Sequence, residues 1–387
     1  MAESCEFIIV GAGLSGLNAA ITLQAAGREV LVIDANDRPG GRIATDKVDG
    51  YLCDRGFQLI NAKYPSLVSL NVIEEIDFIC APRAIEVALE NERHFLGDPR
   101  TAPLSILNKA TGTIPEKISL VRVLLSRAKP NQSIGELLQS SGSCYERVLR
   151  PFLQGVFLAD PDRVDARFGL TVLRSFVNGS PGLPRLGVGA LPEALAKRIK
   201  NITLNTRVDR ISGQTLETTQ GKFVAKKIIV ATDSTTAAQL LDLKEGTPMA
   251  GCITWYHATS LNPSGSGRLV IDGQHRGPVY NSLVVSDISS AYAPVGQNLI
   301  STTTGLGASE SDVRRHLSIM WGVDTRDWNL IAKYEIPGAL PLHSVGKSLS
   351  QQFAISDSIF VAGDHRTIPS QQGALFAGKV AAELALN

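Results

Sequence analysis

The most constraining feature of this chain is a G-x-G-x-x-G motif near its start, because it stands between two apolar runs, residues 7–10 and 30–33. Both runs predict buried strands, and the alanine-rich stretch between them predicts a helix. Gly11 permits a tight turn after the first strand, Gly13 lets a ligand approach the backbone, and Gly16 lets the helix pack against the sheet. The chain therefore opens with a strand–turn–helix–strand unit that suits a dinucleotide.

An acidic residue closes this unit. Asp34 follows the second strand, 18 residues after Gly16, and is followed by Ala35. A carboxylate at this place can accept hydrogen bonds from both hydroxyls of a ribose, and it would repel a 2′-phosphate. The helix that begins at the glycine turn points its unpaired N–H groups and the positive end of its dipole at the phosphates. We expect Asp34 and Ala35 to contact the cofactor.

A second glycine turn, Gly40-Gly41-Arg42, separates two classes of dinucleotide protein. In NAD-dependent dehydrogenases the chain continues its sheet here, whereas many flavoproteins have this turn and place the arginine on the pyrophosphate. A guanidinium suits phosphate because it offers several fixed hydrogen-bond donors. An exposed turn with a solvated arginine is the alternative. Together with the first motif, the turn favours FAD.

The composition excludes several other classes of protein. The 387 residues include 38 Lys and Arg and 37 Asp and Glu. The resulting net charge of +1 does not indicate a basic surface that binds nucleic acid. No apolar run approaches the roughly 18 residues that span a bilayer, and the first strand leaves no room for a signal peptide. The five cysteines are scattered without C-x-x-C spacing, and the six histidines are equally dispersed. We therefore expect reduced thiols, no metal site and a cytoplasmic location.

Two distant segments can complete the sheet that the first unit begins. Residues 226–232 and 358–364 are short apolar runs that end in small residues, and an alanine-rich helix is predicted at 373–386 after the second run. A hairpin-like stretch at 202–224 precedes the first run. We expect an α/β fold with a Rossmann-type nucleotide domain and an inserted α+β substrate domain.

The remaining sequence predicts two insertions between these pieces. The expected elements are helices at 118–127, 134–139, 144–158 and 310–321, an extended pair within 85–96, and strands at 251–258, 269–271 and 299–304. The predicted division assigns 1–60, 195–240 and 353–387 to the nucleotide domain, and 61–194 and 241–352 to the substrate domain. Interleaving of this kind favours a site at the seam between the two domains.

Further motifs lie along nearly the whole chain. They are Asp54-Arg55-Gly56-Phe57-Gln58, the stretches 151–158, 184–192, 205–208, 293–296 and 339–341, Ala362-Gly363-Asp364, and Ser370-Gln371-Gln372-Gly373-Ala374. With the N-terminal glycines they resemble the FAD-dependent amine oxidase and phytoene desaturase superfamily. The resemblance implies a glutathione-reductase-like FAD-binding domain.

The resemblance and the motifs together predict the cofactor contacts. The predicted contacts are Gly11, Gly13, Gly16, Asp34, Ala35, Gly41, Arg42, Gly56, Phe57, Gln58, Val208, Gly363, Asp364, Gly373 and Ala374. In relatives the segment 54–58 runs beside the isoalloxazine ring, and the backbone of the valine matching Val208 meets the adenine. The cofactor that we predict is FAD.

The C-terminal motif has a physical rationale of its own. Asp364, at a strand end, can accept a hydrogen bond from a ribityl hydroxyl. The helix that starts near Gly373 can direct its N–H groups at the pyrimidine edge of the flavin, where negative charge collects on reduction. The alternative is a strand-to-helix turn in which these residues serve only as a cap.

The predicted reaction follows from one departure from the family pattern. Many amine oxidases carry a lysine that holds a water against flavin N5, but residues 248–256 contain none. We expect an FAD-dependent dehydrogenase, desaturase or oxidase that takes a hydride from a C–C or C–N centre of an apolar small molecule. No acid–base pair is evident, and His365, Gln58 and Tyr256 are the candidate catalytic residues.

Two other functions and several electron acceptors stay open. A flavin-dependent isomerase would use the same cofactor without net oxidation, and a flavin-bound protein without turnover would serve a complex. The glycines around 187–189 lack a strand–helix–strand frame, so no second nucleotide fold is evident. Electrons therefore pass to oxygen, a quinone or a protein acceptor in our prediction, and we expect no nucleic-acid partner and no transmembrane segment.

Overall fold

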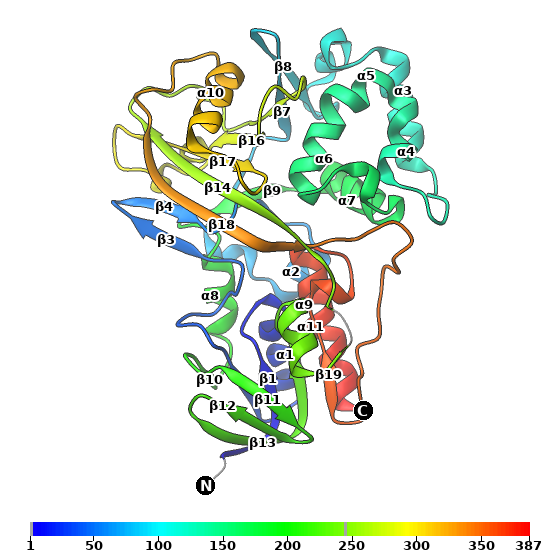
Figure 1. Ribbon diagram of the computed structural model, residues 1–387, viewed down its shortest axis with the longest axis vertical. Coiled ribbons are helices and arrows are strands. Elements are labelled where there is room, and N and C mark those ends of the chain that lie inside the picture. Colours follow the sequence, from blue (N-terminus) through cyan, green and yellow to red (C-terminus); the bar gives the residue numbers. More distant parts are fainter. Residues whose placement is uncertain (1–2, 244–245) are drawn as a thin grey trace.

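Seven strands from three distant stretches of the chain form one sheet in the computed structural model, which describes residues 3–243 and 246–387 (Figure 1). In order across the sheet they are β10 (Ile202–Thr203), β2 (Val30–Ile33), β1 (Glu3–Val10), β13 (Gly221–Val230), β12 (Thr215–Thr218) and β11 (Val208–Ser212), with β19 (Ile359–Val361) also paired with β13. The strands β10, β2, β1, β13 and β19 run parallel, and β11 and β12 form an antiparallel hairpin. The predicted Rossmann-type sheet is confirmed.

Two helices with small side chains cover one face of this sheet. α1 (Leu14–Ala25) and α11 (Gln371–Leu386) lie against each other, although they come from opposite ends of the chain (Figure 1). Their buried alanines allow a close approach, and a Cβ on Gly378 would collide with the carbonyl of Ser15. The side-chain amide of Asn18 donates to the carbonyl of Leu375 at 2.7 Å and fixes their register. The two ends of the chain therefore form one packed unit.

A second seven-stranded sheet forms the other half of the molecule (Figure 1). Its order is β18 (Asn329–Pro341), β14 (Met249–Thr259), β17 (Asn298–Thr304), β16 (Val279–Val284), β15 (Leu269–Asp272), β7 (Ala84–Leu89) and β8 (Glu92–Gly97). All neighbours are antiparallel except β15 and β7. α10 (Glu310–Trp321) buries Leu317, Met320 and Trp321 in one cluster with Trp255 of β14. Because side chains alternate along a strand, the even-numbered residues of β14 face away from α10.

A layer of helices lies beside this second sheet. It contains α3 (Ile114–Leu125), α4 (Ile134–Leu138), α5 (Gly142–Cys144), α6 (Arg150–Phe157) and α7 (Ala166–Asn178). The helix predicted at 144–158 is present, but it contains a π-helical turn at Tyr145–Leu149 between α5 and α6. Pro151 stands in the first turn of α6 and lacks the N–H that a continuous α-helix would use.

Shorter elements connect the two halves. They are the hairpin β3 (Thr45–Val48) and β4 (Tyr51–Asp54), the small sheet β5 (Ile60–Asn61), β9 (Pro181–Pro184) and β6 (Phe78–Cys80), and the helices α2 (Pro65–Leu70), α8 (Ala190–Ala196) and α9 (Ser234–Leu240). The hydroxyls of Tyr256 and Tyr292 donate to the carbonyl and the carboxylate of Asp54, at 3.0 and 2.8 Å. Asp54 therefore ties β4 to the second sheet. The exact residue limits of the two predicted domains stay a prediction.

Candidate functional site

One cavity of about 1010 Å³ extends from the glycine turn after β1 to the second sheet. We call its two parts the nucleotide end and the apolar end. The nucleotide end is lined by residues within 10–15, 33–36, 40–43, 206–208, 231–233 and 363–364. The apolar end is lined by residues of α6 and α7 and by Cys252, Leu269, Asn281, Thr303 and Ile336. The cavity therefore lies at the seam that the interleaved sequence predicts.

The three motif glycines have different structural roles near the nucleotide end. Gly11 has φ +108°, and a Cβ there would lie 2.8 Å from the carbonyl oxygen of Ala231, so no other residue suits the turn. A Cβ on Gly13 would meet no atom within 4 Å, although Gly13 lines the cavity. Gly16 does not line it, since a Cβ on Gly16 would collide with the carbonyl of Gly11. Gly13 thus leaves room for a ligand, and Gly16 serves helix packing.

The N-terminus of α1 presents unpaired donors to this end. Gly13 caps the helix without a side-chain hydrogen bond. The Ser15 hydroxyl, in the first turn, is buried, lines the cavity and has no hydrogen-bond partner among the described residues. Free backbone N–H groups and a hydroxyl at a helix N-terminus suit a phosphate.

Asp34 stands at the end of β2, as predicted, and lines the cavity together with Ala35. Its carboxylate accepts hydrogen bonds from the backbone N–H of Ala12 at 2.6 Å and of Asn36 at 2.8 Å, which fixes its orientation. The side-chain amide of Asn36 also donates to Oδ1 at 2.9 Å, so Oδ2 is the oxygen that retains a lone pair for a ribose hydroxyl. Val208, at the start of β11, also lines this end.

The second glycine turn packs directly on the first. The N–H of Gly40 donates to the carbonyl of Ala12 at 2.8 Å, and this contact brings Arg42 to the cavity. Burial alone would lower the pKa of Arg42, but the Asp364 carboxylate outweighs burial and raises it, so the guanidinium stays charged. The positive φ of Gly41, +58°, lets the chain turn toward the cavity at this point.

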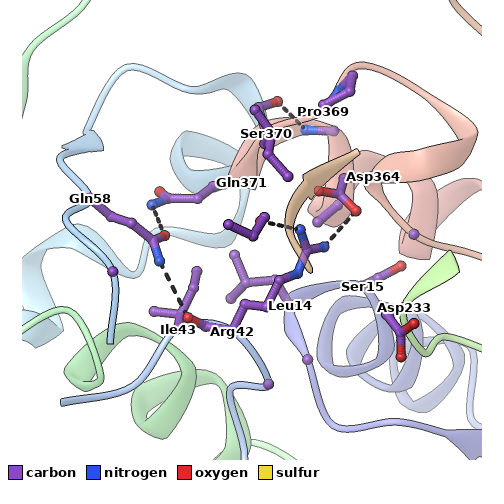
Figure 2. A pocket seen from close by; sticks show the side chains of 18 of the residues that line it. Leu14, Ser15, Arg42, Ile43, Gln58, Asp233, Asp364, Pro369, Ser370 and Gln371 are labelled. Atoms are coloured by element: carbon purple, nitrogen blue, oxygen red, sulfur yellow. Dashed lines mark hydrogen bonds and ion pairs between the residues drawn. The ribbon is translucent and has the colours of Figure 1, made fainter. Parts of the chain in front are cut away.

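Arg42 and Asp364 form an ion pair with each other (Figure 2). Arg42 donates to the Asp364 carboxylate at 2.6 Å and to the carbonyl of Ala339 at 2.9 Å. The sequence predicted separate partners, a pyrophosphate for Arg42 and a ribityl hydroxyl for Asp364. In the structure the two side chains contact each other, and both residues also line the cavity, so the predicted contacts to the cofactor stay predictions.

A pair of glutamines faces the Arg42–Asp364 pair across the cavity (Figure 2). Gln371 donates from Nε2 to Oε1 of Gln58 at 3.2 Å, and Gln58 donates from Nε2 to the backbone carbonyl of Arg42 at 3.3 Å. Since a carbonyl can only accept, this chain fixes both amide orientations. Oε1 of Gln371 is buried without a partner among the described residues, which presents an acceptor. Gly56 and Phe57 line the cavity next to Gln58.

The N-terminus of α11 differs from the prediction. The helix begins at Gln371, and the hydroxyl of Ser370 accepts a hydrogen bond from the N–H of Gly373 at 3.0 Å. The N–H of Ala374 donates to the carbonyl of Ser370 at 2.9 Å. Gly373 and Ala374 line the cavity, but their N–H groups are used by this cap. The first amides of the helix therefore belong to Gln371 and Gln372.

The apolar end contrasts with these polar contacts. The side chains that α6 and α7 contribute to it include Phe152, Val156, Phe168, Val172 and Phe176. Among the described residues that line the cavity, the charged ones are Asp34, Arg42, Arg55, Arg207, Asp233 and Asp364. All but Arg55 belong to the nucleotide end, and Arg55 pairs with Asp46 at 2.7 Å. None of the charged lining residues therefore comes from α6, α7 or the second sheet.

The three candidate catalytic residues separate in the structure. Gln58 lines the cavity, but Tyr256 and His365 do not. Tyr256 is fully buried and uses its hydroxyl on the carbonyl of Asp54, so it has no free group for catalysis. His365 is buried beside Asp364, and burial lowers its pKa to about 4, which keeps it neutral. The positions of Tyr256 and His365 do not support a catalytic role.

Sequence reasoning missed several polar residues that line the cavity, among them Ser15, Gln371, Asn281 and Thr303. Ser15 and Gln371 lie inside motifs that the sequence analysis identified. Each has a polar side chain in the first turn of a helix, and this position could have indicated a ligand contact. Asn281 and Thr303 lie on strands that pair only in the folded chain, so no local sequence pattern marks them.

Residues 3–243 and 246–387 contain neither a metal-binding cluster nor a membrane-spanning helix. No group of three or more His, Cys, Asp and Glu side chains lies close enough to hold a metal ion. Within the same residues, no helix has both the length and the apolar character that crossing a bilayer requires.

The nucleotide end fits a dinucleotide with a pyrophosphate. The open space beside Gly13, the unpartnered hydroxyl of Ser15 and the oriented carboxylate of Asp34 are arranged around one region. These are the groups that a pyrophosphate and a ribose require. Space continues from there past Gln58 toward α6 and α7.

Comparison with known proteins identifies what this arrangement resembles. The sequence profile of the flavin-containing amine oxidoreductases matches residues 14–386. The chain is 27% identical to the chloroplastic protoporphyrinogen oxidase of Nicotiana tabacum over 191 residues, which cover 43% of this chain and 32% of that protein. It is 27% identical to the probable flavin-containing monoamine oxidase A of Dictyostelium discoideum over 274 residues, 62% and 60% of the two proteins. These matches span less than two thirds of either relative.

Solved structures share the fold over the whole chain. An oxidoreductase from Methanosarcina mazei has a TM-score of 0.76 at 15% identity and covers 98% of this chain and 100% of its own. The cyclohexylamine oxidase from Brevibacterium oxydans has a TM-score of 0.72 at 18% identity, with 99% of both chains covered. At this identity the likeness shows the fold alone.

Proposed function

The chain belongs to the family of flavin-containing amine oxidoreductases, and from this premise we propose that it removes a hydride from a C–C or C–N centre of an apolar small molecule. That it is an FAD-dependent oxidoreductase follows from the family. Bound FAD supplies the hydride acceptor, its N5 atom. The nature of the substrate is the part that we propose here.

The observation that carries the proposal is the absence of charge at the apolar end. The cavity continues from the nucleotide end into a region where Phe152 and Phe176 pack edge to face, with ring centres 5.2 Å apart. No described residue that lines this region carries a charge. A substrate with a fixed charge would lose its hydration there without gaining a partner, which costs several kcal/mol. The lining therefore favours a substrate that is largely apolar and neutral.

The chain's own residues have three tasks in this proposal. Phenylalanines of α6 and α7 exclude water and orient the substrate by shape. Gln58 and Gln371 hold each other in one orientation between the two ends of the cavity. The N-terminus of α11 contributes the positive end of its dipole, which favours negative charge on a nearby ring.

The lysine pattern supports a dehydrogenase or desaturase over fast amine oxidation. Strand β14, which reaches the cavity at Cys252, contains no lysine between Met249 and Thr259. No lysine occurs among the described residues that line the cavity. The water-holding lysine of many amine oxidases therefore has no counterpart along this strand. We propose oxygen, a quinone or a protein as the final electron acceptor, and a cytoplasmic location stays a prediction.

Anaerobic addition of substrates to the FAD-loaded protein tests the proposal. We expect an apolar compound with an oxidisable C–C or C–N centre to bleach the flavin absorbance. Hydrophilic diamines such as putrescine should leave it unchanged. Bleaching by hydrophilic amines alone would contradict the proposed substrate class. Product formation without bleaching or an acceptor would indicate the flavin-dependent isomerase instead, and a spectrum that no compound changes would indicate a flavin-bound protein without turnover.

A further inference from the structure

We propose that Asn281 and Thr303 form a substrate-binding contact for one neutral hydrogen-bonding group, such as a hydroxyl or a carbonyl, on an otherwise apolar substrate. This inference rests on the proposed function and narrows its substrate class. The two residues lie on the second sheet at the apolar end of the cavity, on β16 and β17.

Strand pairing places the two side chains next to each other. Asn281 and Thr303 are direct partners in the antiparallel register of β16 and β17. Residues that face each other across a strand pair point to the same side of the sheet and lie within contact distance. Thr254 of β14 is the partner of Thr303 on its other side, and Cys252 lies two residues before Thr254 on the same face. The sheet therefore presents one small polar area to an apolar cavity.

Thr303 contributes a polar atom without a partner to this area. It is 4% exposed, and its hydroxyl makes no hydrogen bond among the described residues. Asn281 is 7% exposed, and it lines the cavity beside Thr303. A buried polar group without a partner costs about 1–3 kcal/mol of stability, so a ligand that supplies a partner to Thr303 recovers it. An unpartnered hydroxyl next to an amide that lines the same cavity indicates a binding contact.

The surrounding helix leaves space for the amide. A Cβ on Gly155 of α6 would lie 2.5 Å from Nδ2 of Asn281, so glycine at 155 leaves the amide its place beside α6. Gly155 lines the cavity as well, between Phe152 and Val156. The amide of Asn281 therefore lies against an apolar helix face. Polar groups in an otherwise apolar wall set the orientation of a ligand.

The chemistry of the area selects a neutral group. An amide, a hydroxyl and a thiol are uncharged, and burial raises the pKa of the Cys252 thiol to about 11. The amide can both donate and accept, and so can the hydroxyl. A hydroxyl or a carbonyl can satisfy both residues at once. An ammonium or a carboxylate would need an opposite charge, which the apolar end lacks among the described residues.

Four compounds with one ten-carbon skeleton test the inference in the FAD-loaded protein. Geraniol, geranylamine, geranic acid and the hydrocarbon 2,6-dimethylocta-2,6-diene differ only in the end group. Binding is measured from the perturbation of the flavin spectrum under anaerobic conditions. We expect geraniol to bind at least about fivefold more tightly than each of the other three, the effect of one or two neutral hydrogen bonds.

Substitutions of Asn281 and Thr303 test whether these two residues cause the preference for geraniol. Asn281→Leu and Thr303→Val keep the volume but remove the polar atoms, and each should reduce the preference for geraniol over the hydrocarbon to about twofold or less. Thr303→Ser keeps the hydroxyl and should retain the preference. Thr171→Val is the matched control, because Thr171 also lines the cavity but its hydroxyl already donates to the carbonyl of Arg167 at 2.8 Å. Flavin content and thermal unfolding confirm that each variant is folded.

The outcomes separate this inference from the proposed function. Tighter binding of geranylamine or geranic acid, equal binding of all four compounds, or no binding of geraniol would overturn the inference. An unchanged preference in Asn281→Leu and Thr303→Val would overturn it too. Binding requires no turnover, so a preference for geraniol without flavin bleaching by any compound would support the contact and contradict the proposed reaction.

Discussion

The nucleotide end and the apolar end of the cavity differ in how they hold polar groups. At the nucleotide end the charges are paired or oriented by the backbone, as in the Arg42–Asp364 ion pair and the Asp34 carboxylate. At the apolar end the polar groups of Asn281 and Thr303 are neutral, and the Thr303 hydroxyl is unpartnered among the described residues. The cofactor can be bound by charged residues that lie close together in the sequence. The proposed substrate contact is instead formed by neutral side chains of neighbouring strands in a wall without charge.

The two ends also differ in how far apart in the sequence their residues lie. The glycine turn, Asp34 and the second glycine turn lie within 32 consecutive residues, 11–42. The apolar end combines α6 and α7 with strands of the second sheet, the first of which, β14, begins 71 residues after Asn178, the last residue of α7. The two ends should therefore respond independently to substitutions.

The largest expected effect comes from Gly13→Val, which should abolish FAD retention and leave the fold intact. The backbone of Gly13 has φ −72°, which any residue can adopt, and an added Cβ would meet no protein atom within 4 Å. The two added methyl groups would occupy the space of the pyrophosphate. We expect FAD affinity to fall by at least about 100-fold. The ratio of flavin to protein after purification measures it.

A second glycine provides the control for that substitution. Gly338 of β18 also has room for a side chain, since the nearest atom to an added Cβ is Cε of Met249 at 4.0 Å, and it does not line the cavity. Gly338→Val should retain full flavin content. Full flavin in Gly13→Val would show that the pyrophosphate lies elsewhere.

The next largest effect is a pH-dependent change in stability caused by Asp54, the residue that joins the two halves of the molecule. Burial raises the pKa of Asp54 to about 6, and hydrogen bonds from Thr45, Tyr292 and Val188 offset only part of that increase. The unfolded value is about 3.9, so the folded protein holds the proton more tightly. The stability that this group contributes is complete below about pH 4 and is lost as the pH rises through about 6. Asp54→Asn should therefore gain about 3 kcal/mol relative to the parent between pH 4 and pH 7.5.

Urea unfolding of both proteins across this pH range measures the difference. Taking the difference between parent and variant removes the titration of all other groups. Asp357→Asn is the control, because Asp357 is exposed, and the same comparison should show a change within about 0.5 kcal/mol. A difference for Asp54→Asn that does not vary with pH would show that its carboxyl titrates normally.

The same contrast explains what the sequence could predict. The motif at 11–16 and Asp34 form local turns whose geometry depends on a few neighbouring residues, so their positions were predictable. The strands β1, β2, β13 and β19 were found because buried parallel strands are continuous apolar runs. The family membership and the cofactor followed from these features and are confirmed.

The apolar end was harder to predict for physical reasons. Strand β18 (Asn329–Pro341) was missed, because half-exposed side chains and two prolines hide its pattern. α7 was missed although it lines the cavity with five residues, at spacings of three and four. The pairing of Arg42 with Asp364 joins residues 322 positions apart, and each was assigned a separate ligand. Contacts of this kind depend on the tertiary structure and leave no local signal.

The smallest expected effect is the stability change on breaking the Arg42–Asp364 ion pair. It shows whether Arg42 binds Asp364 or the cofactor phosphates. Arg42→Met leaves the carboxylate of Asp364, 4% exposed, without its cation. Breaking a fully buried pair costs 3–5 kcal/mol, but the Arg42 side chain is 34% exposed, so we expect a loss of about 2 kcal/mol in the flavin-free protein. Adding Asp364→Asn should recover most of that loss, because no unpaired charge remains. Urea unfolding of the four proteins gives the coupling energy.

The same cycle in the presence of saturating FAD separates the two roles of Arg42. If Arg42 turns to the pyrophosphate when FAD binds, its coupling to Asp364 should fall below about 0.5 kcal/mol, and Arg42→Met should weaken FAD binding about tenfold. If the ion pair persists, the coupling stays near its flavin-free value, and the sequence-based placement of Arg42 on the phosphates is wrong. In that case the nucleotide end would hold the pyrophosphate with backbone N–H groups and Ser15, and the charge of Arg42 would serve to position Asp364.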